Sequence, residues 1–409
     1  MIKLTRCLFL FSALLATVVL APAQSVEKVV AGVSTDRLKR FDTFIKSEID
    51  KGNLAGAVAR VMRDGILVHQ SAQGFKNIAD QSPMKTDDIF FIQSMTKPVI
   101  TVAFLMLYEE GYFQLTDPVS KYIPAFKDLR VSKDVKEGAG GATVPMDSEV
   151  TLAQLLSHTS GLTHGLGQSQ LDKDFMKGYF MKPWPDIKAR AANITKFPLL
   201  AQPGTQWNYS AAHDVISMLI EQFSGMSTQE FLAERIFKPL GMKDTGYNLS
   251  KEQQARVVRV YSKEADGKLV PLTDQPKVEG NTIWSGVNGL FSTAADYMNF
   301  CQMLLNGGKW NGKLLLSRKT VDLMTSNLTG KLFTRPGEGF GLGVAVMVDV
   351  PESKLLGSNG IFYWAGAYNT HFFIDPKEKL VAVFFTQESH FTFYWHDKMR
   401  QLVYQALVD

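Results

Sequence analysis

The sequence predicts a mixed α/β fold of the α+β type, in which one antiparallel sheet flanked by helices joins a mostly helical second lobe. Three observations carry this prediction. A hairpin pattern follows the N-terminal region, strand patterns dominate the end of the chain, and a long, mostly helical stretch separates the two. A single sheet built from both chain ends satisfies all three. We expect the sheet lobe at about 33–90 and 335–409, and the helical lobe at about 94–330.

The first helix and hairpin are marked by their apolar spacing and turn residues. The segment TDRLKRFDTFIKSEIDKG has apolar residues at helical intervals, which predicts a helix capped by Thr35 or Asp36 and stopped by Gly52. Asp64-Gly65 then separates two β-rich runs, which is a strong signal for a hairpin.

The remaining elements follow from the same reasoning. Strands are expected in FGLGVAVMVDV, GIFYWAGAYNTHFFID and KLVAVFFTQ, with Asp375-Pro376 opening the turn between the last two and a closing helix from about Tyr394 to Leu407. Helical periodicity predicts the middle helices at 97–111, 151–157, 211–224, 228–238 and 293–305.

The N-terminus has the three parts of a secretory signal. Lys3 and Arg6 precede an apolar run that ends at Ala21-Pro22-Ala23. We expect residues 1–23 to be a signal peptide cleaved after Ala23, leaving one domain at 24–409 and no stable membrane anchor. An uncleaved anchor is the alternative, although the run is short for a membrane span. Cleavage would leave Cys301 as the one cysteine, so that the mature chain could form no internal disulfide. An exported protein with so little cysteine fits a bacterial periplasm, which is the expected location.

Composition argues against several classes of partner. The chain has 44 Lys and Arg against 40 Asp and Glu, a net charge of +4, which gives no electrostatic case for nucleic acid. The histidines form no recognisable ligand set; His158 and His164 flank a Thr-Ser-Gly loop without metal-site spacing. We therefore expect no metal and no cofactor. The oligomeric state is not readable from the sequence.

Ser94 and Lys97 stand in a polar interruption of an apolar segment, FIQSMTKPVI. Their i, i+3 spacing places both side chains on one helix face, and Pro98 fits the first turn of a helix that begins near Ser94. Unpaired N–H groups at such a helix start favour a developing anion, and a lysine among apolar residues can act as a base toward a serine. The alternative is a helix-capping serine with a surface lysine.

Two further segments support the first interpretation. Tyr209, in QPGTQWNYSAAHD, stands where a turn passes into a helix, so that its hydroxyl can face a cleft and shuttle protons beside the lysine. Alternatively, it covers the start of that helix. Trp364-Ala365-Gly366 interrupts a bulky aromatic strand, where glycine often marks close approach of a ligand or of another backbone, or a simple β-bulge. The strand's N–H and that of Ser94 could together bind an oxyanion.

Aromatic residues suggest a cleft lined by rings, although core packing explains most of them equally well. They are Trp207, Trp284, Tyr363, Trp364 and Tyr368.

Taken in order, these motifs resemble the serine β-lactamase and DD-peptidase superfamily, in its class C-like branch. TLAQLLSHTSGLTHG, PGTQWNYS, KPLGMKDTGY and GLFSTAADYMNF extend the resemblance over nearly the whole mature chain. The resemblance implies Ser94 as nucleophile, Lys97 as its base and Tyr209 as a second base or acid. It also implies the Ala367 N–H, with that of Ser94, as the oxyanion hole, and Trp364, Ala365 and Gly366 as the substrate-binding strand.

Two departures direct the expectation of substrate. Class C β-lactamases carry Tyr-x-Asn, where this chain has Tyr209-Ser210-Ala211, and Lys-Thr-Gly, where it has Trp364-Ala365-Gly366. Tyr-Ser with Asp214 nearby and Trp-x-Gly is instead similar to family VIII carboxylesterases, apart from Ala365 where Gly is usual.

We therefore expect an exported serine hydrolase acting on small carboxylic esters. The alternatives are a β-lactamase or D-peptide hydrolase acting on an amide, and a catalytically silent protein that binds cell-wall peptides.

Overall fold

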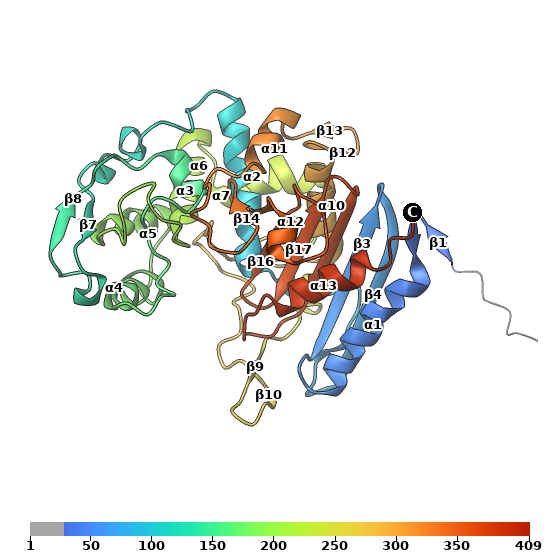
Figure 1. Cartoon of the computed structure of the whole chain (residues 1–409). Coiled ribbons are helices and arrows are strands. Elements are labelled where there is room, and N and C mark those ends of the chain that lie inside the picture. Colours follow the sequence, from blue (N-terminus) through green and yellow to red (C-terminus); the bar gives the residue numbers. More distant parts are fainter. Residues whose placement is uncertain (1–27) are drawn as a thin grey trace, which may run out of the picture.

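The computed structural model describes residues 28–409, so the predicted signal segment lies outside the described residues. The described residues contain one eight-stranded antiparallel sheet (Figure 1). The strand order is β14-β15-β16-β17-β18-β3-β4-β5. The strands are β3 (Gly56–Arg63), β4 (Ile66–Asn77), β5 (Ser82–Pro83), β14 (Glu338–Phe340), β15 (Ala345–Met347), β16 (Phe362–Gly366), β17 (Thr370–Asp375) and β18 (Leu380–Phe385).

The two ends of the chain meet in the middle of this sheet. β18 pairs antiparallel with β3, from Leu380↔Arg63 to Phe385↔Val58. Arg63 reinforces the junction by pairing with Glu378 at 3.0 Å and with Asp409 at 2.8 Å. The predicted fold class and the hairpin at Asp64-Gly65 are therefore confirmed.

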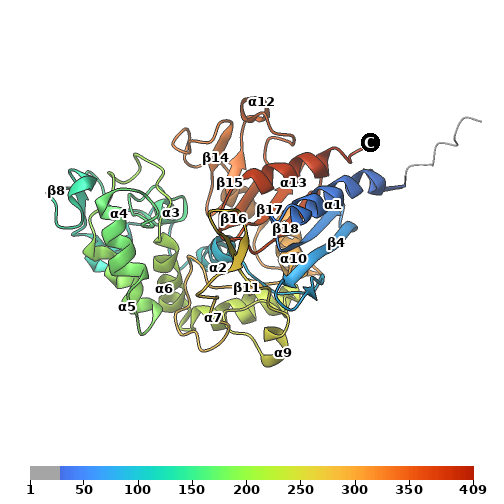
Figure 2. The ribbon, with the colours of Figure 1, turned by 90° about the horizontal axis from the view of Figure 1, so that it is seen from below.

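Helices cover both faces of the sheet. α1 (Thr35–Asp50) and α13 (Tyr394–Tyr404) pack together on one face, and α10 (Ala294–Leu305) packs against β3, β17 and β18 on the other (Figure 2). The sequence placed the helix at 293–305 in the helical lobe, which is wrong, because periodicity identifies an apolar face but not its neighbour. The cap of α1 also differs: Ser34 accepts a hydrogen bond from the backbone N–H of Arg37 at 3.1 Å.

The second lobe is built from short helices and loops, at the left of Figure 1. Its helices are α3 (Leu152–Leu156), α4 (Gln170–Phe175), α5 (Ile187–Ala192), α6 (Ala212–Ser224) and α7 (Thr228–Leu232), with the π-helical segment η5 (Met176–Phe180). The hairpin β7 (Arg130–Ser132)–β8 (Thr143–Pro145) extends from it. The segments that follow α7 leave this lobe: η7 (Ala233–Phe237) leads into α8 (Lys238–Leu240), which contacts α10, and α9 (Lys251–Gln254) lies below the sheet in Figure 2. The hairpin β9 (Tyr261–Lys263)–β10 (Leu269–Pro271) lies instead beside the sheet, where Tyr261 bridges to Glu388 and its hydroxyl accepts from the N–H of Ile78.

Small elements complete the described chain. They are the pairs β1 (Val29–Val30) with β2 (Val33–Ser34), β6 (Phe90–Phe91) with β11 (Phe291–Ser292) and β12 (Lys309–Trp310) with β13 (Lys313–Leu314), and the helices α11 (Arg318–Met324) and α12 (Val350–Ser353).

The helix α2 (Thr96–Glu109) lies between the lobe and the sheet and is buried on all sides through residues 96–107. A helix without a solvent face is a core element. Its first turn, which contains Lys97, is therefore held in place by both parts of the molecule.

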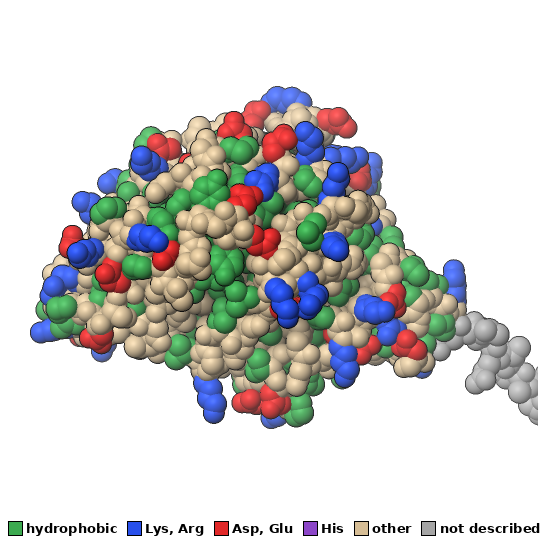
Figure 3. Space-filling view, turned by 90° about the horizontal axis from the view of Figure 1, so that it is seen from above, with side chains coloured by type: hydrophobic (Ala, Val, Ile, Leu, Met, Phe, Trp, Pro, Cys, Tyr) green, Lys and Arg blue, Asp and Glu red, His purple; other side chains and the backbone are tan. Residues whose placement is uncertain are grey.

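The face drawn in Figure 3 carries no dominant charge. Figure 3 shows basic and acidic side chains interspersed over the face that it draws, without a large area of one sign. In residues 28–409 there is no helix with the length and apolar character needed to cross a bilayer.

Candidate active site

Ser94 lies in the short 3₁₀ segment η1 (Gln93–Met95) that leads directly into α2. Pro98 falls in the first turn of α2, where a missing N–H costs nothing, as the sequence predicted. Gln93, immediately before the serine, has a φ of 49°, in the left-handed region. Strained backbone of this kind is found at functional sites, where the surroundings hold it in place. Ser94, the next residue, lines the cavity described below.

Lys97 is fully buried one helical turn beyond the serine. Its Nζ lies 3.3 Å from Ser94 Oγ and donates to the carbonyl of Val287 at 2.9 Å. Burial in this site lowers the pKa of Lys97 to about 7, and the negative charge of Asp214 opposes part of that effect. A substantial fraction of the amine is therefore neutral near pH 7, and the expectation of a surface lysine is excluded.

Tyr209 lies just before α6, and its ring covers the ammonium group: Lys97 Nζ is 4.5 Å from the ring centroid. Its hydroxyl is buried and makes no hydrogen bond of standard geometry with the described residues. Burial raises the pKa of Tyr209, although the neighbouring Ser94 hydroxyl and Trp364 indole lower it in part. Tyr209 is therefore protonated in the resting enzyme.

Three imidazoles lie near Tyr209 and Lys97, and two of them, His158 and His213, are fully buried. The ring of His164 stacks on Tyr209 at 5.1 Å between centroids, the ring of His158 lies 4.8 Å from it, and His213 lies 5.2 Å from His158. Burial lowers the pKa of each well below its usual range, and the charge of Lys97 adds to this. All three are neutral near pH 7. Among residues 28–409, no group of three or more His, Cys, Asp or Glu side chains has the geometry of a metal site.

The end of β16 runs directly past the nucleophile. A Cβ on Gly366 would overlap the carbonyl oxygen of Ile92 and the hydroxyl of Thr370. The ladder between β16 and β17 is regular from Phe362↔Ile374 to Gly366↔Thr370, so Gly366 marks close backbone approach and not a bulge. This approach brings Ala367 to the cavity that contains Ser94.

The cavity has a volume of about 350 Å³ and is mostly apolar. Five of the predicted site residues, Ser94, Tyr209, Trp364, Ala365 and Ala367, line it. Lys97 and Gly366 are not among the lining residues: Lys97 reaches Ser94 Oγ, and Gly366 makes the backbone contact beside the cavity. The other lining residues are Leu166, Trp207, Ser389, Phe391 and Phe393.

Part of this wall has no signal in the sequence. Ser389, Phe391 and Phe393 belong to the loop before α13, which is attached to the β16–β17 turn by one buried side chain. Asn369 Nδ2 donates to the carbonyls of Glu388 at 2.9 Å and His390 at 3.0 Å, while its Oδ1 accepts from Thr392 N. Such a contact depends on the completed fold.

The aromatic cleft suggested by the sequence is only partly correct. Trp207 and Trp364 line the cavity. In contrast, Tyr363 is buried with its hydroxyl on Glu338, and Trp284 packs against Tyr247. Neighbouring residues of a strand point to opposite faces, so Tyr363 and Trp364 cannot both face the cavity.

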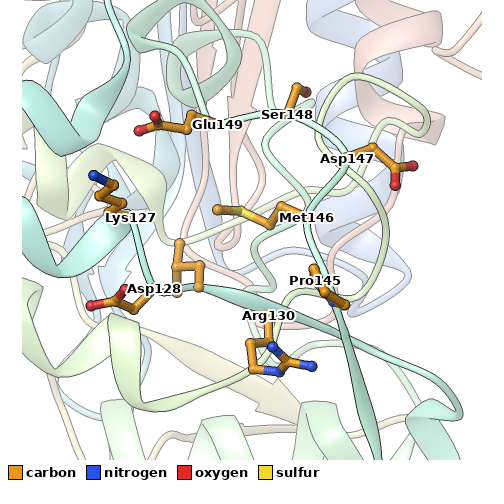
Figure 4. Close-up of a pocket in the computed structure, with 9 residues that line it drawn as sticks. Lys127, Asp128, Arg130, Pro145, Met146, Asp147, Ser148 and Glu149 are labelled. Carbon is orange, nitrogen blue, oxygen red and sulfur yellow. The ribbon is translucent and has the colours of Figure 1, made fainter.

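A larger hollow, of about 620 Å³, lies elsewhere (Figure 4). It is lined by residues 127–130 and 145–149, at the β7–β8 hairpin and its flanking loops. Charged side chains such as Lys127, Arg130 and Asp147 surround it, and none of the predicted site residues contributes. It is therefore separate from the cavity at Ser94.

Comparison with known proteins agrees with this geometry. The Beta-lactamase family model matches residues 41–405. Protein Rv1367c of Mycobacterium tuberculosis is 33% identical over 84% of this chain and 88% of its own length, and Esterase EstB of Burkholderia gladioli is 25% identical over 86% and 90%. Other relatives are named as a lovastatin esterase, an acyltransferase and a putative D-alanyl-D-alanine carboxypeptidase.

The fold is shared with solved structures as well. EstCE1, described as a hydrolase with promiscuous acyltransferase activity, superimposes with a TM-score of 0.78 at 24% identity, over 90% of this chain and 99% of the other. The match of the family model over most of the chain is the decisive result. The chain belongs to the Beta-lactamase family and is a serine hydrolase of the β-lactamase and penicillin-binding-protein fold, related to EstB-like esterases.

Proposed function

We propose that the protein is an exported serine esterase that forms an acyl-enzyme on Ser94 and hydrolyses small, uncharged carboxylic esters. The observation that carries this proposal is the composition of the cavity wall. Among the described residues that line the cavity with Ser94 there is no lysine, arginine, aspartate or glutamate. Such a wall favours an uncharged, largely apolar substrate.

The first half of the reaction uses the groups beside Ser94. Neutral Lys97 accepts the Ser94 proton while Oγ attacks the ester carbonyl, and the N–H groups of Ser94 and Ala367 stabilise the resulting oxyanion. As the C–O bond breaks, protonated Tyr209 donates its proton to the leaving alkoxide and releases an alcohol. The ammonium of Lys97, beneath the Tyr209 ring, then returns a proton to the phenolate.

Water completes the turnover by the reverse proton path. Tyr209 passes its proton to neutral Lys97 as it takes one from the attacking water, and the acyl carbonyl again becomes an oxyanion. Ser94 Oγ then leaves with the proton from Lys97 as the carboxylic acid is released. The protonation states needed at the start, neutral lysine and protonated tyrosine, are those that burial favours in the free enzyme.

The position of Trp364 argues against substrates that carry a carboxylate. The resemblance to class C β-lactamases puts Trp364 where those enzymes have a lysine, which helps to bind the carboxylate of a β-lactam or of a terminal D-residue. An indole offers one neutral N–H donor, and burial of an unpaired carboxylate against an apolar wall costs several kcal/mol. Ester substrates avoid this cost.

The first prediction concerns the substrate. We expect the mature protein to hydrolyse p-nitrophenyl esters, with kcat/KM rising over short acyl chains and falling once the chain exceeds the cavity. It should also react with a fluorophosphonate, while Ser94→Ala does neither. A chromogenic cephalosporin and a D-Ala-D-Ala peptide, measured in parallel, should turn over far more slowly. Faster turnover of either would replace the esterase proposal, and absence of both labelling and turnover would leave the silent-binder alternative.

The second prediction concerns pH. Because burial lowers the pKa of Lys97 to about 7, the amine is neutral above this pH and protonated below it. We expect kcat/KM for a neutral ester to fall about tenfold per pH unit below about pH 7. Lys97→Arg, which cannot lose its proton, should be inactive throughout. If kcat/KM does not change between about pH 5 and about pH 9, the range in which a buried amine titrates, Lys97 is not the base.

The third prediction concerns Tyr209. Tyr209→Phe removes the proton donor for the leaving group, so kcat should fall by about 10²–10⁴-fold without a large change in thermal stability. Tyr404→Phe is the matched control, because the Tyr404 hydroxyl donates to Asp375, which lies at the end of β17 opposite Thr370. It should lose stability but not turnover. Wild-type rates in Tyr209→Phe would exclude the residue from the mechanism.

The fourth prediction concerns export. If residues 1–23 direct secretion, the protein expressed with its own N-terminus in a Gram-negative host should be recovered from the periplasm. Its N-terminal sequence should begin at Gln24. Recovery of the full-length chain in the cytoplasm would contradict export and leave the esterase chemistry untouched.

A further inference from the structure

Asp214 is a fully buried carboxylate in the first turn of α6, and the reaction outlined above does not use it. Three hydrogen bonds reach it: Tyr179 Oη donates to Oδ2 at 2.9 Å, Ser285 Oγ donates to Oδ1 at 2.6 Å, and the Val287 N–H donates to Oδ1 at 3.3 Å. Arg190 on α5 pairs with Oδ2, with its Nε 3.0 Å away. Asp214 thus joins η5, α5 and the loop at 285–287.

This loop is the segment that holds Lys97. The Val287 carbonyl accepts from Lys97 Nζ at 2.9 Å, while the N–H of the same residue donates to Asp214 and also lies 3.2 Å from Ser285 Oγ. A short path therefore runs from the carboxylate through the backbone of one residue, Val287, to the amine.

The loop has little freedom to move. Tyr247 Oη donates to the Ser285 carbonyl at 2.8 Å. A Cβ on Gly286 would overlap the carbonyl of His213, so the loop lies directly against the start of α6. The position of the Val287 carbonyl is consequently set by α6 and its carboxylate.

Asp214 also provides the negative charge that acts on Lys97. The amine faces Ser94, Val287 and the Tyr209 ring directly, and none of these groups is charged in the resting enzyme. The surrounding imidazoles, His158, His164 and His213, are neutral. Asp214 raises the pKa of Lys97 against the larger effect of burial. Arg190 is also charged, and it pairs with Oδ2 of Asp214, the oxygen that does not accept from Val287.

We propose that Asp214 is a positioning residue for Lys97: through Ser285 and Val287 it holds the carbonyl that keeps Nζ beside Ser94. The negative charge of Asp214 acts on the amine as well. This inference rests on the proposed role of Lys97 as base. The competing explanation is a purely structural ion pair, in which Asp214 and Arg190 fasten α6 to α5 and the guanidinium stacks on Tyr179 and Phe180.

Two substitutions separate the tether from the charge. Asp214→Asn keeps an acceptor for Ser285 and Val287 but removes the charge. We therefore expect the acidic limb of kcat/KM to move about one unit toward lower pH, with the plateau largely retained. Ser285→Ala keeps the charge but removes a hydrogen bond to the carboxylate and loosens the loop. We expect the plateau to fall about 10²-fold, with the acidic limb unmoved. Asp214→Ala should show both effects.

Asp375→Asn is the matched control, because Asp375 is a fully buried carboxylate at the opposite end of β17 from Thr370. It should lower the melting temperature and leave the pH profile in place. The proposal is overturned if folded Asp214→Asn and Ser285→Ala both keep the wild-type profile, or if Asp375→Asn reproduces their effects. If Asp214→Asn does not fold, Ser285→Ala decides alone: a wild-type plateau overturns the tether.

The failure of this inference can be distinguished from failure of the proposed function. The rate at which a fluorophosphonate labels Ser94 is measured against pH in each variant, beside ester turnover. A wild type that neither labels nor hydrolyses removes the proposed function. A wild type that labels with an acidic limb unaltered by Asp214→Asn, and a rate unaltered by Ser285→Ala, removes only the role of Asp214.

Discussion

The burial of one ammonium group determines much of the rest of this structure. Lys97 lies in the first turn of a helix without a solvent face, and removal of an amine from water disfavours its charged form. The protein supplies a carbonyl, a hydroxyl and an aromatic face, all of which accept the group in either protonation state. The result is an amine that titrates near neutrality beside a serine, which is what a base for a hydroxyl nucleophile requires.

The same constraint explains why the surroundings of Lys97 are polar but uncharged. Three histidines and a tyrosine are packed within this region, and burial keeps all four neutral. A cation among them would lower the affinity of Lys97 for its proton still further, and an anion in direct contact would hold the proton too tightly. Val287 lies between Asp214 and Lys97, and the positive charge of Arg190 pairs with the Asp214 carboxylate. The charged groups of this region are thus kept out of direct contact with Lys97.

The sequence predicts the parts of this arrangement that depend on local spacing. The i, i+3 pair of Ser94 and Lys97, the tyrosine before a helix and the small residues in an aromatic strand all lie where expected. What could not be predicted depends on contacts between distant segments. Phe391 and Phe393 reach the cavity because Asn369 fastens their loop, and the partners of Asp214 come from three separate stretches. The position of α10 on the sheet was missed for the same reason.

The junction of the two chain ends has a further consequence for when the enzyme becomes competent. The Thr370 hydroxyl donates to the Ile92 carbonyl across 278 positions of sequence, and Arg63 meets Glu378 across 315. Contacts of such long range form late, because loop closure must be completed before they contribute stability. A growing or C-terminally shortened chain contains the serine and its lysine but not the strand that faces them. An unfinished molecule therefore lacks the strand that is proposed to supply half of the oxyanion site, and it acquires that strand only when the last part of the chain has folded.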